Sequence, residues 1–78
     1  MMQFAAQASK YFESVEIVVL HHPAKADAPS GTAARTAELI NDARKSVKKA
    51  AMPDATTSEI DGARGAKIGD VHVHSVRL

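Results

Sequence analysis

The alternation of hydrophobic and polar residues predicts a helix followed by a strand in the first part of the chain. Apolar residues recur at helical spacing before residue 13 and predict an amphipathic helix over residues 2–12. The run VEIVVLHH, which begins at Val15, is short and dense in β-branched residues, and it predicts a strand that is apolar on both faces. A helix joined to a strand by a short link indicates αβ units. The residues on the apolar side of the helix are Met1, Phe4, Ala5, Ala8, Tyr11 and Phe12.

A second helix is predicted after Pro29, with Ser30 as its N-cap. Four cations gather at its C-terminal end, and we interpret them as a solvated helix end rather than as an anion site. Residues 53–70 are rich in Pro, Gly, Asp, Thr and Ser and predict a long surface loop, and Val71 to Leu78 predicts a closing strand. The apolar stripe of the helix consists of Ala33, Ala37, Ile40, Ala43 and Val47, and the four cations are Arg44, Lys45, Lys48 and Lys49.

Length and composition limit the chain to one small domain and exclude several functions. Seventy-eight residues with three aromatic side chains offer little for an independent core. Ten Lys and Arg balance nine Asp and Glu, so the charge does not favour nucleic acid as a partner. No apolar run approaches the ~20 residues of a membrane span, and there is neither a signal peptide nor a cysteine, so we expect a cytoplasmic protein. The uncapped first helix and the abrupt final strand predict a segment of a larger protein.

The stretch LHHPAKADAPSGTA, from Leu20 to Ala33, concentrates groups that carry protons. His21 and His22 lie at the C-terminal end of the predicted strand, where α/β proteins often place ligands, and Lys25 follows in a loop. A histidine close to a lysine suits general acid chemistry, because two neighbouring cations lower each other's pKa. The alternative is a pair of surface histidines without a chemical role.

The second half of this stretch predicts a site for an anion. If Ser30 caps the helix, the backbone N–H groups of Gly31 and Thr32 point out of its N-terminus and favour a carboxylate. The alternative is an ordinary capped helix start. Asp27 is either a partner that orients Lys25 or an alternative cap. Together the two halves predict a pocket for a small carboxylated substrate that must be protonated.

The run VEIVVLHHPAKADAPSGTAARTAELI resembles the substrate domain of the 4-hydroxy-tetrahydrodipicolinate (dihydrodipicolinate) reductases of bacterial and plant lysine biosynthesis. The family's pattern is E-x-x-x-x-H-H-x-x-K-x-D-x-P-S-G-T-A, and the opening helix, ARGAKIG and VHVHSVRL also have counterparts in it. The residues that match the pattern are Glu16, His21, His22, Lys25, Asp27, Pro29, Ser30, Gly31, Thr32 and Ala33.

This resemblance implies the fold and the role of each site residue. The fold would be a mixed α/β sheet with helices packed on one face, and residues 1–78 would be part of the C-terminal substrate-binding and oligomerisation domain of a two-domain reductase. His21 and Lys25 would be the catalytic acids, and His22, Gly31 and Thr32 would contact a dicarboxylate substrate. NADPH or NADH would be bound by an N-terminal domain that this chain lacks, and would deliver hydride to a cyclic imine. The family implies a homotetramer joined through the sheets of this domain.

Two other functions stay open at this point. His72 and His74 alternate on one strand and, with His21 and His22, could supply zinc ligands, although no cysteine or carboxylate completes a familiar spacing. A segment that only self-associates is the other alternative. The run GARGAKIG contains no G-x-G-x-x-G and precedes a strand instead of a helix, so we expect the chain alone to be inactive.

Overall fold

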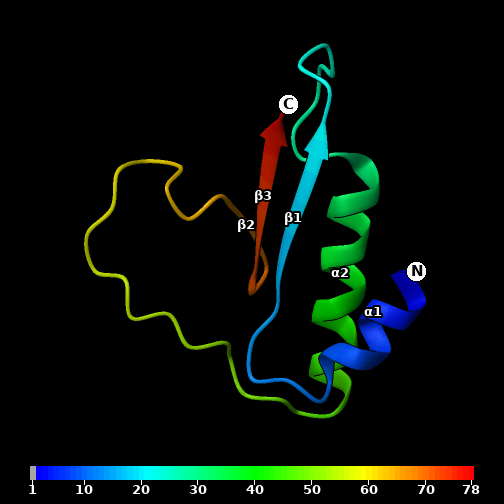
Figure 1. Ribbon diagram of the computed structural model, residues 1–78. Helices are drawn as coiled ribbons and strands as arrows, with labels where there is room; N and C mark the ends of the chain where they lie inside the picture. Colours follow the sequence, from blue (N-terminus) through cyan, green and yellow to red (C-terminus); the bar gives the residue numbers. More distant parts are fainter. Residues whose placement is uncertain (1) are drawn as a thin grey trace.

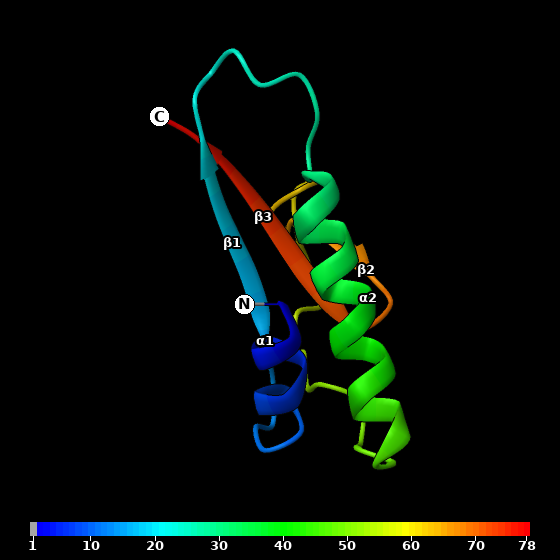
Figure 2. The same cartoon turned by 90° about the vertical axis from the view of Figure 1, so that its right-hand side faces the viewer.

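The computed structural model describes residues 2–78 as a three-stranded mixed sheet with two helices on one side (Figures 1 and 2). The strand order is β1-β3-β2, in which β1 runs parallel to β3 and β2 antiparallel to it. This is the arrangement that the family resemblance implied. No helix in this part of the chain has the length and apolar character to cross a membrane. The elements are α1 (Met2–Ser9), β1 (Glu16–His21), α2 (Gly31–Ser46), β2 (Ala66–Ile68) and β3 (Val71–Arg77).

The core lies between α2 and the sheet and is built from small aliphatic side chains. Alanines on the sheet-facing side of α2 let the helix approach the strands closely, and Ile40 fills the space that remains. No aromatic residue contributes: Phe4, Tyr11 and Phe12 are all exposed. The buried core residues are Ala33, Ala37, Ile40, Val71 and Val73.

Helix α2 starts as predicted and ends earlier than its apolar pattern indicates. Ser30 is the N-cap, and its Oγ accepts the Ala33 N–H at 3.1 Å. Val47 was placed on the buried stripe, but it follows the last helical residue and is half exposed. The core therefore ends near Ile40, and the side chain buried one turn later is that of Arg44.

The interpretation of Arg44 as part of a solvated helix end was wrong. Its side chain is buried, with 4% of the residue exposed, and the guanidinium donates to three main-chain carbonyls that follow or end α1. The acceptors are Ser9 O (2.8 Å), Phe12 O (2.6 Å) and Glu13 O (2.8 Å). These carbonyls lie at or beyond the end of α1, where helical donors run out, although Ser9 O also accepts the Phe12 N–H at 3.4 Å. Arg44 binds all three and so joins α1 to α2.

The first helix is shorter than predicted. It ends at Ser9, so Tyr11 and Phe12 lie in the following turn rather than on a helical face. The helix buries Ala6 and Ser9 against α2 and leaves Phe4 exposed. The predicted start at residue 2 is therefore confirmed, whereas the predicted end at residue 12 and the placement of Tyr11 and Phe12 on the helix were wrong. Met1, the first member of that face, lies outside the described residues.

Within residues 2–78, helices cover only one face of β1 (Figure 2). Ile17, Val19 and His21 turn toward α2 and are half-buried, whereas Val18 and Leu20 point to the opposite side and are 58% and 57% exposed. The prediction of a strand that is apolar on both faces is correct for these four aliphatic residues. No element within residues 2–78 packs on the second face, because both helices lie on the first (Figure 2).

The predicted surface loop over residues 53–70 was wrong at its end, where β2 forms a hairpin with β3. Gly69 and Asp70 connect the two strands, and Gly69 has a φ of 58°, which glycine tolerates better than other residues. Asn41 on α2 binds both sides of this turn: its Nδ2 donates to Ile68 O at 2.9 Å, and its Oδ1 accepts the Asp70 N–H at 3.1 Å. A Gly-Asp dipeptide between two β-rich runs is the signal that predicts such a hairpin.

We expect Arg44→Ala to destabilise the domain by about 2–3 kcal/mol, because it removes charge-assisted hydrogen bonds to three carbonyls. Urea denaturation followed by circular dichroism measures the change. Lys45→Ala is the matched control: it removes a neighbouring exposed cation and should stay within about 0.5 kcal/mol of wild type. Equal stability of the two variants would show that the Arg44 hydrogen bonds contribute nothing.

Candidate functional site

An open pocket of about 620 Å³ lies between the carboxyl end of β1 and the amino end of α2. The loop over residues 22–29 connects these two ends and rises above them (Figure 2). Four of the five predicted site residues line this pocket, namely His21, Lys25, Gly31 and Thr32. The lining residues that the sequence analysis did not assign to the site are Ile17, Val19, Leu20 and Thr36, together with Ser30 and Ala33.

His21 reaches the pocket from the last position of β1. Strand alternation turns its ring to the side that α2 covers, where the residue is half-buried. Its Nδ1 atom is buried and has no hydrogen-bond partner among residues 2–78. A buried polar atom without a partner is costly, so the environment of this nitrogen is a local cost in the fold.

Lys25 enters the pocket from the loop and is held by Asp27. The two side chains form an ion pair, with Lys25 Nζ 2.7 Å from Asp27 Oδ1, and 30% of the lysine side chain is exposed. The hydrogen bond from Lys25 is the main reason that the pKa of Asp27 lies below its ordinary value of 3.8. Of the two roles open to Asp27 from the sequence, the structure therefore supports the orientation of Lys25, because Ser30 is the cap of α2.

The first turn of α2 presents two backbone N–H groups to the pocket. Ser30 accepts from the amides of Ala33 and Ala34, through its hydroxyl and its carbonyl. The amides of Gly31 and Thr32 precede these bonds and have no acceptor within the helix. A Cβ atom added at Gly31 would meet no atom within 4 Å, so a ligand has room to approach the backbone there. Such a helix start favours a carboxylate by about 0.3–1 kcal/mol from the dipole alone.

His22 is the one predicted site residue outside the lining of this pocket. It follows the end of β1 and is exposed, and its Nδ1 accepts the Ala24 N–H at 3.0 Å. Its ring is therefore held against its own loop. Its contact with substrate stays a prediction.

His72 and His74 take part in a polar cluster on the opposite face of the sheet. His74 Nε2 lies 2.6 Å from Glu16 Oε1, and His72 contacts the Arg64 carbonyl at 2.6 Å and Asp54 Oδ2 at 3.3 Å. Arg64 also donates to both carboxylate oxygens of Glu16, at 3.2 and 2.8 Å. The cluster ties the long loop before β2 to β1 and β3. Within residues 2–78, no three His, Cys, Asp or Glu side chains are placed to hold a metal ion, and the comparisons below do not favour the zinc alternative.

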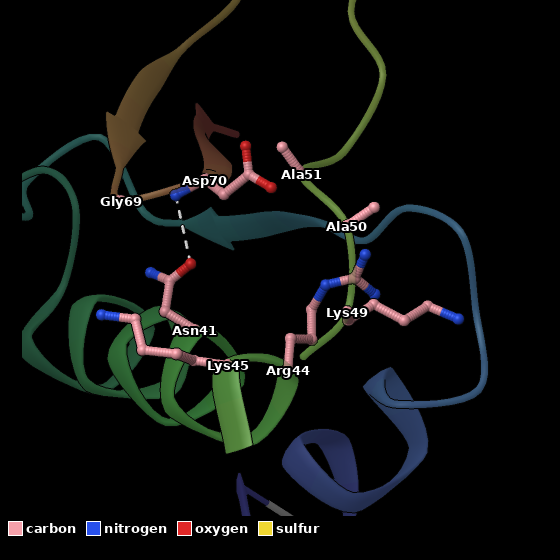
Figure 3. A pocket seen from close by; sticks show the side chains of 8 residues that line it. All are labelled: Asn41, Arg44, Lys45, Lys49, Ala50, Ala51, Gly69 and Asp70. Carbon is pink, nitrogen blue, oxygen red and sulfur yellow. Dashed lines mark hydrogen bonds between the residues drawn. The ribbon is translucent and has the colours of Figure 1, made fainter. Parts of the chain in front are cut away.

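A second pocket, of about 480 Å³, lies at the other end of α2 (Figure 3). Lys45 and Lys49 supply positive charge there, but Asp70 shares the pocket, and its Oδ2 accepts the Met52 N–H at 2.6 Å. The C-terminal end of a helix is also its negative end. This pocket is therefore less suited to a dicarboxylate than the pocket at Gly31 and Thr32.

The fold and the first pocket together define a class of protein. A small α/β domain holds two proton-carrying side chains, His21 and Lys25, opposite a helix start with free backbone amides. This combination is typical of an enzyme domain that binds a small carboxylate and handles a proton.

The comparisons with known proteins define the family. Residues 1–78 match the family model for the C-terminus of dihydrodipicolinate reductase. The 4-hydroxy-tetrahydrodipicolinate reductases of Mycolicibacterium smegmatis and Thermobifida fusca are 66% and 63% identical to the chain, over 99% and 100% of its length. Dipicolinate-bound dihydrodipicolinate reductase from Paenisporosarcina sp. TG-14 superposes with a TM-score of 0.80 and 45% identity over 99% of this chain. The chain belongs to the dihydrodipicolinate reductase C-terminal family.

The chain corresponds to only a part of these relatives. It covers 31% of the Mycolicibacterium smegmatis protein, 32% of the Thermobifida fusca protein and 28% of the solved Paenisporosarcina chain. The match shows that the chain corresponds to the C-terminal region of the reductases of this family, as the resemblance implied.

The Glu16 cluster should make stability depend on pH. Hydrogen bonds from Arg64, and then from His74, lower the pKa of Glu16 from 4.5 to about 2. Because the folded-state pKa is the lower one, the carboxylate stabilises the fold above about pH 4.5, and this contribution disappears as the pH falls toward 2. At pH 6 we expect the free energy of unfolding of wild type to exceed that of Glu16→Gln by less than about 1 kcal/mol, because the ion pair between Glu16 and Arg64 is partly exposed.

Urea denaturation at a series of pH values tests this expectation. The difference between wild type and Glu16→Gln should vanish as Glu16 becomes protonated. Glu59→Gln, at an exposed residue with no hydrogen bond to the rest of the described chain, is the control and should show no such trend. A difference for Glu16→Gln that stays constant from pH 6 to 2.5 would contradict the assignment.

Proposed function

We propose that the chain is the substrate-binding and proton-donating part of an NAD(P)H-dependent 4-hydroxy-tetrahydrodipicolinate reductase of lysine biosynthesis. The observation that carries this proposal is the convergence of His21, Lys25, Gly31 and Thr32 on one open pocket. The names of the relatives, which cover nearly the whole chain, support it. We call the longer polypeptide that contains the chain, on this proposal, the parent reductase.

The ligand of the pocket is proposed to be a small cyclic dicarboxylate. The solved relative is described as bound to dipicolinate, a molecule of this kind. One carboxylate would accept hydrogen bonds from the Gly31 and Thr32 amides. The Lys25 ammonium group would contact a second polar group of the ligand, since 30% of the lysine side chain is exposed. His22 would join them only if its ring turned from the loop toward the pocket.

His21 and Lys25 are proposed as the groups that hold and deliver the proton. The 4-hydroxy substrate would first lose water to give a conjugated cyclic imine. Hydride addition to this imine then yields an enamine, which must gain a proton to give the reduced product. Lys25 carries such a proton as an ammonium ion, and His21 has an unpaired buried ring nitrogen beside the same pocket. Both residues line the same pocket as the helix start, so a ligand bound there would lie near groups suited to general acid catalysis.

The nicotinamide that supplies the hydride is proposed to bind outside this chain. Gly65 leads into the short strand β2, and Gly69 forms the hairpin turn, so neither opens a helix that could cradle phosphates. A separate nucleotide-binding domain of the parent reductase would hold NADPH or NADH. The chain alone should then show no turnover. We propose the cytoplasm as the location, because NAD(P)H and the biosynthetic pathway are found there.

The exposed face of the sheet is proposed as the contact between copies in a homotetramer. Val18 and Leu20 on β1 and Val76 on β3 form an apolar row, because the parallel register pairs Leu20 with Val76. Burying such a row excludes water from contiguous aliphatic surface, which is the main driving force for association.

Lys25→Ala should lower the kcat of the parent reductase by ~10²-fold or more, because a general acid contributes most in the transition state. The rate of NAD(P)H oxidation, followed by absorbance with the cyclic substrate, measures the effect. Lys49→Ala removes a cation at the opposite end of α2 and serves as the control, and the isolated chain serves as the blank. A Lys25→Ala variant that keeps kcat within about twofold of wild type would remove Lys25 from the chemistry.

Pyridine-2,6-dicarboxylate should bind at the start of α2. Titration of the ¹⁵N-labelled chain should shift the amide resonances of Gly31 and Thr32, because a carboxylate accepts those N–H groups. Lys25→Ala should weaken the titration, whereas Lys49→Ala should not change it. Shifts that cluster instead around Lys49 and Asp70 would assign the ligand to the second pocket (Figure 3).

A further inference from the structure

Arg77 ends β3 beside the loop that carries Lys25. The parallel register pairs Arg77 with His21, and the Leu78 N–H donates to the His21 carbonyl at 2.9 Å, so the pairing continues past the end of the strand. Paired residues of neighbouring strands point to the same side of a sheet. Arg77 therefore points to the same side of the sheet as His21, the side on which the pocket lies.

Arg77 makes the one hydrogen bond within residues 2–78 that joins the loop over residues 22–29 to another segment. Its Nη2 donates to the Asp27 carbonyl at 2.7 Å. The other hydrogen bonds of the loop are internal, between His22, Ala24 and Lys25 and between Lys25 and Asp27. A segment with so few external bonds has many accessible conformations, and Arg77 restricts them.

The connection continues from the Asp27 main chain to the ammonium group of Lys25. The Asp27 carboxylate accepts from Lys25 Nζ at 2.7 Å, and the lysine lines the pocket. A guanidinium group stays charged at every physiological pH and presents its donors in a rigid plane, so it holds a carbonyl in a defined place. A chain of two short hydrogen bonds thus runs from the sheet to the proposed acid.

We propose that Arg77 is a positioning residue, which holds Asp27 and, through the Asp27 carboxylate, places the Lys25 ammonium group at the pocket. This inference rests on the proposed function, because the position of Lys25 matters only if Lys25 acts in the reaction. Residues that orient a reacting group can affect the rate strongly without touching the substrate.

The experiment is a double-mutant cycle in the parent reductase. Arg77→Ala should lower kcat by about tenfold or more, while the KM for the nicotinamide cofactor changes by less than about twofold. In a Lys25→Ala background the same substitution should add less than about twofold, because the group that Arg77 positions is already absent. Arg77→Lys should recover part of the lost kcat, and Lys45→Ala, far from the pocket, should keep kcat within about twofold of wild type.

Asp27→Asn tests the same connection without a change in β3. Asp27 is exposed, so this variant should fold, and its loss of kcat should also disappear in the Lys25→Ala background. Losses that multiply in both double variants would overturn the positioning role and leave the proposed function intact. Wild-type kcat for Lys25→Ala would contradict the proposed role of Lys25, and the inference about Arg77 would fall with it.

Discussion

The parallel pairing of β1 with β3 is the constraint on which the rest of this domain depends. It aligns six residues of each strand, from Glu16 opposite His72 to His21 opposite Arg77. At one end it builds the polar cluster that holds the long loop, and at the other it brings Arg77 beside the loop of Lys25. A parallel pair needs a long crossover, and here the crossover contains α2, whose first turn supplies the amides that we propose bind a carboxylate. A shift of this register by one residue would turn His21 away from the pocket.

The two ends of α2 have opposite electrostatic character, and the fold uses them differently. Its amino end faces the open pocket with Ser30, Gly31 and Thr32. Near its C-terminal end, Arg44 is buried and binds the carbonyls of α1, so the cation that the sequence suggests as surface charge is a structural connection. Between these ends, the buried alanines Ala33 and Ala37 pack α2 closely against the sheet.

The polar groups of the pocket are few, and each depends on a neighbour for its position. Lys25 relies on Asp27, which in turn is bound by Arg77, and the helix start relies on Ser30. His21 is the exception, because its ring nitrogen has no partner among residues 2–78.

The sequence by itself determined the parts that depend on local chemistry. The Ser30 cap, the strand within VEIVVLHH and the family pattern from His21 to Thr32 were readable because caps and β-branched runs follow local rules and the pattern is a continuous motif. The burial of Arg44, the contact between Arg77 and Asp27 and the register of β1 with β3 were decided only by the tertiary structure. Each of these joins segments that lie 31 to 56 residues apart, as Glu13 does with Arg44 and His21 with Arg77, and no local pattern encodes such a contact. The exposed aromatic residues of the first helix follow the same rule, since helical spacing marks an apolar side but the packing of α1 on α2 decides which side is buried.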